Sequence, residues 1–205
     1  LRTTWTSQKI LMTMNSSNSL SSKKISVIIT AAGSSSRMGG SIKKEYLPYK
    51  NGTVISSCAI AFLKAAEKNK WNLSHFVVTY PCGGLKESQK AVLTPDVKSQ
   101  AFKDISFVEG GDSRQASVFN ALDFINQNGK SDIVLIHDGA RPFVSESLIQ
   151  AVVDSVLKTG DGAVPGLTPT DTIKEIDSEG RIVKHLKRIT LSSVQTPQGF
   201  DFNKL

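Results

Sequence analysis

The sequence predicts an α/β protein whose mostly parallel sheet has helices on both faces. Two observations carry this prediction. Short apolar runs rich in β-branched residues alternate with amphipathic segments of helical period, and glycine-rich polar clusters follow several of these runs directly. A strand-helix unit that recurs five times builds a parallel sheet, because each helix returns the chain to the same edge. With 205 residues, of which 39% are hydrophobic, the chain suits one domain with a single core.

The predicted elements follow one another from residue 25. Val27 to Ile29 form the first strand, and apolar side chains at helical spacing predict a helix over 54–69. The other predicted elements are strands over 76–79, 105–108, 133–137 and near 163–164, and helices over 86–93, 114–125 and 145–158. Two extended runs, 172–176 and 181–186, break this alternation around a polar turn and predict a hairpin arm at about 169–187. Such arms mediate dimerisation in many proteins, so we expect a homodimer through the arm.

Residues 1–24 are excluded from the predicted domain, which covers 25–205. The segment is rich in Ser and Thr and has no acid, so we expect a disordered leader or upstream sequence. Its composition also loosely matches a transit peptide, which would place the protein in a plastid. The leader supplies four of the seven net positive charges, and the remaining +3 is too mild to favour a nucleic-acid partner.

The rest of the composition indicates a soluble protein of a reducing compartment. No apolar run approaches the roughly eighteen residues that span a bilayer, so we expect no membrane partner. Cys58 and Cys82 have neither the spacing of a metal site nor the density of a disulfide scaffold. We therefore expect a cytoplasmic protein with free thiols.

The stretch 25–48 is the strongest functional signal. The first strand runs into Ala-Ala-Gly at 31–33 and then into three serines, which leaves backbone N–H groups open to phosphate oxygens. Arg37, Lys43 and Lys44 follow and add positive charge. The loop is neither a dinucleotide fingerprint nor a Walker motif, because the glycines do not stand at the required offsets. The alternative is a plain strand-to-helix turn with capping serines and solvated lysines.

Polar clusters also follow two later strands of the predicted sheet. The 105–108 strand leads into a glycine turn that opens a helix carrying Ser117, and the 133–137 strand leads into Asp138 and Gly139. Ligands of open parallel sheets bind beyond the carboxyl ends of the strands. Asp138 therefore suits a ribose or a metal-bound triphosphate, or else caps its turn. His137, which ends an apolar strand, is more typical of a hydrogen-bonded structural residue than of a catalytic base.

The arm and the segment after it carry a second group of polar residues. Asp171 and Lys174 form a surface ion pair, or the acid and Thr172 bind the hydroxyl groups of a polyol. Arg188 and the 195–199 turn pack the arm, or close over a second phosphate. The sequence leaves both pairs of interpretations open.

Taken together, these motifs resemble the cytidylyltransferases that activate 2-C-methyl-D-erythritol 4-phosphate in non-mevalonate isoprenoid biosynthesis. The matching pieces run from residue 25 to the end of the chain: AAGSSSRMG, KEYL, GGDSRQASV, HDGARPFV, DTIK and VQTPQGF. The resemblance implies a Rossmann-like fold of the nucleotide-diphospho-sugar transferase type. It also implies transfer of CMP from CTP to the polyol phosphate, release of pyrophosphate, and Mg²⁺ bound mainly through the triphosphate. The family normally continues past residue 205 with a further helix, a last strand and a lysine.

The resemblance also implies a role for individual residues. Arg37 and Lys44 are the implied catalytic groups, which stabilise charge on the α-phosphate. Nucleotide binding is implied for Ala31, Ala32, Gly33, Ser34, Gly110, Asp112, Ser117, Asp138 and Gly139. Substrate binding is implied for Arg141, Asp171, Thr172, Arg188 and Thr196. A weak metal contact is implied for Asp138.

Two alternatives remain beside this interpretation. A sister enzyme that acts on ribitol 5-phosphate shares the fold and the cytidine site, but it commonly carries valine where Ala140 stands, which favours methylerythritol. The alternative of another class is a catalytically inactive nucleotide-binding protein with the same fold. The presence of both Arg37 and Lys44 argues against the inactive protein.

Overall fold

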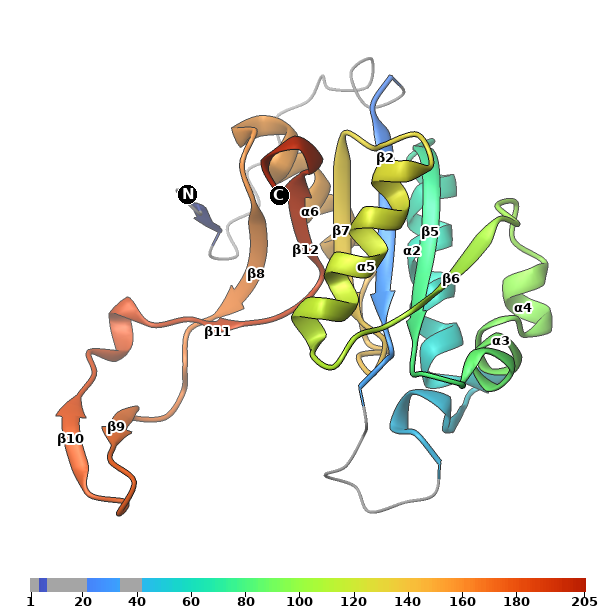
Figure 1. Cartoon of the computed structure of the whole chain (residues 1–205). Coiled ribbons are helices and arrows are strands. Elements are labelled where there is room, and N and C mark those ends of the chain that lie inside the picture. Colours follow the sequence, from blue (N-terminus) through green and yellow to red (C-terminus); the bar gives the residue numbers. More distant parts are fainter. Residues whose placement is uncertain (1–3, 7–21, 34–41) are drawn as a thin grey trace.

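The computed structural model describes residues 4–6, 22–33 and 42–205 (Figure 1). Within these residues, eight strands form one central sheet with the order β1-β8-β12-β7-β2-β5-β6, and β11 pairs with β8. The bounds are β1 (Thr4–Thr6), β2 (Lys24–Thr30), β5 (Asn72–Tyr80), β6 (Ile105–Glu109), β7 (Ile133–Asp138), β8 (Ala163–Leu167), β11 (Ser193–Val194) and β12 (Gln198–Asp201). The predicted α/β class is confirmed.

The centre of the sheet is parallel. Strands β7, β2, β5 and β6 run in the same direction, whereas β12 lies antiparallel between β7 and β8. In β2, Val27 and Ile29 face one layer of the core and Ile28 faces the other, and all three are fully buried. A strand covered on both faces carries a continuous apolar run, which explains why β2 shows no apolar-polar alternation.

Helices cover the two faces unequally (Figure 1). The layer that contains Val27 receives α2 (Val54–Lys68), α3 (Leu85–Val92), α4 (Pro95–Lys98) and α6 (Glu146–Thr159). The layer that contains Ile28 receives α5 (Arg114–Gln127). Side-chain caps define three of the helix starts: Thr53 and Ser56 form a capping box before α2, the Ser113 hydroxyl accepts the Ala116 N–H before α5, and the Ser145 hydroxyl accepts the Leu148 N–H before α6. All four predicted helices begin within one residue of their observed starts, although the start of α3 has no side-chain cap.

The segment 195–199 was expected to be a turn, but its last two residues form part of a strand. Gln198 and Gly199 already belong to β12, which pairs with β7 along its whole length. A four-residue strand that includes glycine gives no readable period, so only its position between β7 and β8 makes it a strand.

The hairpin arm is present and projects from the sheet (Figure 1). Strands β9 (Lys174–Ile176) and β10 (Ile182–His185) pair antiparallel in a separate two-stranded sheet and are shorter than expected. The Asp177 carboxylate closes the turn by accepting the backbone N–H groups of Glu179 and Arg181. The arm and its base expose apolar side chains, among them Ile182 and Ile189.

The remaining elements are short. They are β3 (Pro48–Tyr49), β4 (Gly52–Thr53) and the 3₁₀ helices Lys44–Tyr46, Arg188–Thr190 and Phe202–Lys204. Most of the predicted leader, 1–24, lies outside the described residues; within it, β1 pairs in parallel with β8 and Lys24 opens β2. No helix in the described part of the chain combines the length and apolar character needed to cross a membrane.

Candidate active site

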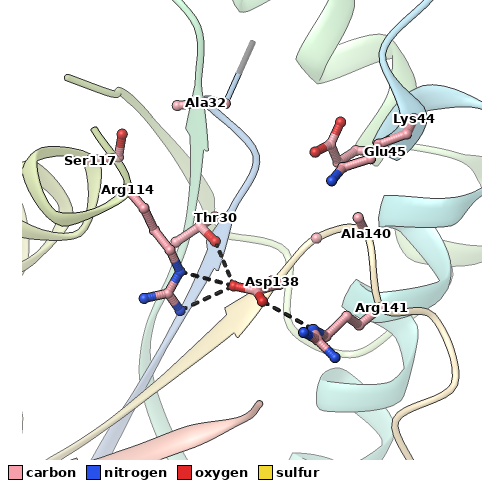
Figure 2. Close-up of a pocket in the computed structure, with 11 residues that line it drawn as sticks. Thr30, Ala32, Lys44, Glu45, Arg114, Ser117, Asp138, Ala140 and Arg141 are labelled. Atoms are coloured by element: carbon pink, nitrogen blue, oxygen red, sulfur yellow. Dashed lines mark hydrogen bonds and ion pairs between the residues drawn. The ribbon is translucent and has the colours of Figure 1, made fainter. Parts of the chain in front are cut away.

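A pocket of about 630 Å³ lies at the carboxyl ends of β2 and β7, where open α/β sheets bind ligands. Four segments converge there: the end of β2, the first 3₁₀ helix, the start of α5 and the loop after β7. The lining residues are Thr30, Ala32, Gly33, Lys44, Glu45, Arg114, Ser117, Asp138, Gly139, Ala140 and Arg141 (Figure 2). Residues far apart in the chain therefore share one cavity.

The glycine turn before α5 packs closely against the end of β2. A Cβ atom on Gly110 would lie 2.2 Å from the Ala32 Cβ and 2.7 Å from the Ser117 Oγ, so only glycine fits at this position. The buried Ser117 hydroxyl donates to the Ser113 carbonyl at 2.8 Å and accepts the Gly111 N–H at 3.2 Å. Ser117 therefore fixes the shape of the turn as well as lining the pocket.

Asp138 is the centre of an ion-pair cluster (Figure 2). Its Oδ1 atom accepts from Nε and Nη2 of Arg114, both at 3.0 Å, and its Oδ2 atom accepts from Nε of Arg141 at 3.0 Å. Burial alone would raise the pKa of Asp138, but the two guanidinium groups outweigh it and hold the pKa below its ordinary value. Asp138 is therefore an ionised acceptor that orients two arginines in the pocket.

The charge of the pocket lining is net positive. Arg114, Arg141 and Lys44 face two carboxylates, those of Asp138 and Glu45. Cations in excess of acids favour an anionic ligand such as a phosphate chain. Beside this lining, the Lys43 ammonium donates to the Gly33 carbonyl, and burial lowers the pKa of Lys43.

A buried hydrogen-bonded layer lies beneath the ion-pair cluster. The Thr196 hydroxyl is 2.9 Å from Nδ1 of His137 and accepts the Asp138 N–H at 3.3 Å. Nε2 of His137 is 3.1 Å from the Arg141 carbonyl oxygen. Burial lowers the pKa of His137 to about 4, so the ring is neutral at pH 7.

The structure brings together many of the residues to which the sequence assigned a role. Those that line the pocket are Ala32, Gly33, Lys44, Ser117, Asp138, Gly139 and Arg141. Three others lie behind it: Ala31 is buried and donates its N–H to Thr79, Gly110 supports Ala32, and Thr196 lies in the buried layer. Asp112 is exposed and does not line the pocket. Ser34 and Arg37 lie outside the described residues.

Three predicted substrate-binding residues are not in this pocket. Asp171, Thr172 and Arg188 belong to the arm and its base, and all three are exposed. The Arg188 guanidinium donates to the Thr170 carbonyl at 2.7 Å, which ties the base of the arm to itself. Within this chain the arm therefore adds none of these side chains to the pocket.

Arg114 is the main site residue that the sequence interpretation missed. It occupies the first position of α5, directly after the Ser113 cap. A cation there is unfavourable toward the helix dipole, so its presence indicates a partner elsewhere. That partner is Asp138, and Arg114 also donates to the Gln198 side chain at 3.3 Å.

A parallel sheet with a cationic, glycine-lined pocket at its carboxyl edge defines an α/β protein of the nucleotide-binding class. The comparisons identify the family: residues 25–205 match the model described as IspD, 2-C-methyl-D-erythritol 4-phosphate cytidylyltransferase, and the chain belongs to this family. The enzyme of that name from Clostridium beijerinckii is 37% identical over 180 residues, which are 87% of this chain and 74% of the relative. The one from Fusobacterium nucleatum is 34% identical over 193 residues, or 94% and 78% of the two chains.

Solved structures agree with these relatives. The 4-diphosphocytidyl-2C-methyl-D-erythritol synthase of Anaerococcus prevotii superimposes with a TM-score of 0.69 at 25% identity, covering 89% of this chain and 73% of the other. The 2-C-methyl-D-erythritol 4-phosphate cytidylyltransferase of Thermus thermophilus gives a TM-score of 0.59 at 29% identity, with 88% and 71% covered. The family resemblance inferred from the sequence motifs is confirmed.

Proposed function

We propose that this protein transfers CMP from CTP to 2-C-methyl-D-erythritol 4-phosphate, which yields 4-diphosphocytidyl-2-C-methyl-D-erythritol and pyrophosphate. The carrying observation is the cationic, glycine-lined pocket at the sheet edge of a chain that belongs to this family. The relatives that cover most of the chain bear the name of this activity.

The reaction is an in-line substitution at the α-phosphorus of CTP. A phosphate oxygen of the polyol phosphate forms the new P–O bond, the bond to the β-phosphate bridging oxygen breaks, and pyrophosphate leaves with the electron pair. Such a transfer needs positioning and charge stabilisation rather than a protein nucleophile. Lys44 supplies a cation at the pocket, and we assign the same task to Arg37, which lies outside the described residues.

The backbone around Ala32 and Gly33, which carries little or no side chain, is the proposed binding site of the nucleotide. The close contact of Gly110 with Ala32 keeps side chains out of this region, so a base and its phosphates approach the main chain directly. Asp138 and Gly139 follow on β7 and are the proposed neighbours of the ribose, while Arg141 is the proposed contact to the polyol phosphate.

Mg²⁺ is the proposed cofactor, held chiefly by the triphosphate. No cluster of three or more His, Cys, Asp or Glu side chains suited to a metal occurs among the described residues. The pocket instead provides the ionised Asp138, and Mg²⁺ is commonly held by one or two carboxylates together with substrate phosphates. Mg²⁺ bound in this way neutralises charge on the phosphates, while Arg114 and Arg141 keep the Asp138 carboxylate in place.

We propose a homodimer in which the arm of one protomer serves the pocket of the other. The predicted substrate-binding residues of the arm do not reach the pocket of their own protomer. The arm also exposes the apolar side chains of Ile176, Ile182 and Ile189 at 60%, 65% and 89%, as an association surface does.

Mixing two inactive variants tests this arrangement. Lys44→Met disables the pocket and Arg188→Ala disables the arm, so each homodimer is expected to lose activity. If the arm acts across the dimer, a mixed dimer contains one site with both residues intact, and co-refolding equal amounts restores activity at that site. If the arm acts within its own protomer, no mixed site is intact and activity stays at the level of the separate variants.

Substrate choice is tested by pyrophosphate release. CTP and the other nucleoside triphosphates are each paired with methylerythritol phosphate and with ribitol phosphate. Ala140 lines the pocket beside Arg141, at the position where the ribitol enzyme commonly carries valine, which favours methylerythritol over the ribitol alternative. Release only with CTP and methylerythritol phosphate supports the proposal, release with ribitol phosphate favours the sister enzyme, and no release favours the inactive nucleotide-binding protein. The proposed compartment is the cytoplasm, because Cys58 and Cys82 are both free thiols and the relatives named above are bacterial.

A further inference from the structure

His137 lies directly beneath the pocket without lining it. It precedes Asp138 at the end of β7, and its side chain is fully buried, with its ring centroid 5.1 Å from that of Phe62. Both ring nitrogens have hydrogen-bond partners: the Arg141 carbonyl, in the loop that lines the pocket, and the Thr196 hydroxyl, in the segment before β12. The question is therefore which parts of the pocket wall this buried histidine holds in place.

The partners define the tautomer of the ring. The Arg141 carbonyl oxygen only accepts, so Nε2 of His137 carries the hydrogen and donates to it. In the neutral ring Nδ1 is then an acceptor, and the Thr196 hydroxyl donates to it. With its one hydrogen used in this way, the Thr196 oxygen accepts the Asp138 N–H through a lone pair.

The result is a directed chain of hydrogen bonds under the pocket floor. It runs from the Asp138 N–H to the Thr196 oxygen, from the Thr196 hydroxyl to His137, and from His137 to the Arg141 carbonyl. These hydrogen bonds connect the end of β7, the loop after it and the segment before β12. The two residues at its ends are those whose side chains form an ion pair in the pocket.

We propose that His137 is a positioning residue that holds the backbone of Asp138, through Thr196, and the backbone of Arg141 in the geometry that the transfer needs. The link to catalysis rests on the proposed function, whereas the positioning itself rests on the hydrogen bonds alone. His137 takes no part in proton transfer, because both of its nitrogens are engaged away from the cavity.

Two substitutions each remove one of the two hydrogen bonds of the His137 ring. The amide nitrogen of Gln reaches the position of Nε2, so His137→Gln keeps the donor to Arg141 and loses the acceptor for Thr196. The amide oxygen of Asn reaches the position of Nδ1, so His137→Asn keeps the acceptor for Thr196 and loses the donor to Arg141. His137→Phe retains ring volume and loses both hydrogen bonds.

The two variants are expected to affect different substrates in the pyrophosphate-release assay. His137→Gln frees the Asp138 side and raises the KM for CTP about tenfold, whereas His137→Asn frees Arg141 and raises the KM for the polyol phosphate about tenfold. Thr196→Val removes the same link as His137→Gln, so the double variant is expected to be no worse than the worse of the two single variants. Equal effects of Gln and Asn on both KM values, or full additivity with Thr196→Val, would overturn the proposal.

Val156→Ala is the control for loss of stability alone. Val156 is buried on α6 and does not line the pocket. The control is expected to lower the melting temperature and to leave both KM values of the folded protein unchanged. If the His137 variants likewise change only the folded fraction, His137 is a core residue and nothing more.

Nuclear magnetic resonance gives a readout that does not depend on turnover. In the wild-type protein at pH 7, the ¹⁵N shifts of His137 are expected to show a protonated Nε2 and an unprotonated Nδ1. The reverse tautomer would contradict the proposed direction of the hydrogen bonds. The Arg141 carbonyl ¹³C resonance, which reports the hydrogen bond with Nε2, should keep its position in His137→Gln and move in His137→Asn. If the wild-type protein released no pyrophosphate, the proposed function would fail while these spectra still decided the positioning.

Discussion

The pocket and the arm both contain residues predicted for one site, but the fold holds the first set in place and leaves the second set exposed. At the pocket, Asp138 is held through both carboxylate oxygens and its backbone N–H. On the arm, Asp171 and Arg188 are exposed and do not line the pocket. The sheet edge thus orders its site within one chain, whereas the arm residues do not line that pocket, and in the proposed dimer they serve the pocket of the other protomer.

The largest effect is expected at Lys44. Lys44→Met removes a cation from the pocket and should lower kcat by about a hundredfold or more, the size seen when one preorganised group is removed from a charged transition state. Steady-state kinetics with CTP as the varied substrate measure this change. The matched control is Lys50→Met, since Lys50 is exposed and lies over the Tyr49 ring outside the pocket. A loss no greater than that of the control removes Lys44 from the mechanism.

The next effect is expected at Gly110. A methyl group in Gly110→Ala would collide with Ala32 and Ser117, and the overpacking should weaken CTP binding by about tenfold to a hundredfold. Calorimetric titration with CTP measures the loss. Ala32→Gly removes one of the two collisions, so the double variant should recover part of the affinity. Undiminished binding by Gly110→Ala would show that the nucleotide lies elsewhere.

A change in stability with pH is expected from His137. Burial lowers the pKa of His137 from an ordinary value near 6.5 to about 4, and the charges of Asp138 and Arg141 beside it act in opposite directions. Between these pH values the unfolded chain binds a proton that the folded protein excludes, so stability falls as the pH drops from 6.5 to 4. Urea unfolding should show the wild-type protein losing about 2–3 kcal/mol relative to His137→Phe over this range. A constant difference between the two proteins would mean that the folded protein protonates His137 as readily as the unfolded chain does.

The smallest effect on the folded protomer is expected on the arm. Ile189 is 89% exposed, so Ile189→Ser should change the free energy of unfolding of the protomer by no more than about 0.5 kcal/mol. Ile149→Ala in the fully buried core provides the contrast, with an expected loss of about 2–5 kcal/mol. Sedimentation velocity should show Ile189→Ser weakening the proposed dimer. An Ile189→Ser variant that remains as dimeric as the wild-type protein would remove this side chain from the association surface.

Much of the fold follows from local patterns. The run around Val27 indicates a strand buried on both faces, and Ser145 marks the start of α6 because its side chain satisfies a backbone N–H there. Strand β12 could not be found in this way, since its four residues show no period and its partners β7 and β8 are distant in the sequence. The role of Arg114 was missed for the same reason: its partner lies 24 positions further along the chain.

Residue types along the chain already indicate its chemistry: glycines where a ligand comes close to the backbone, cations for phosphate, and a carboxylate at the end of β7. These depend on residue type and on neighbours in the chain, which short-range sterics and hydrogen bonding control. Which of these groups meet depends on the fold. The packing of β2, β7 and α5 placed Arg114 on Asp138, put Thr196 under the pocket and left Arg188 on the arm, because such contacts arise from burying the two faces of the sheet and not from spacing along the chain.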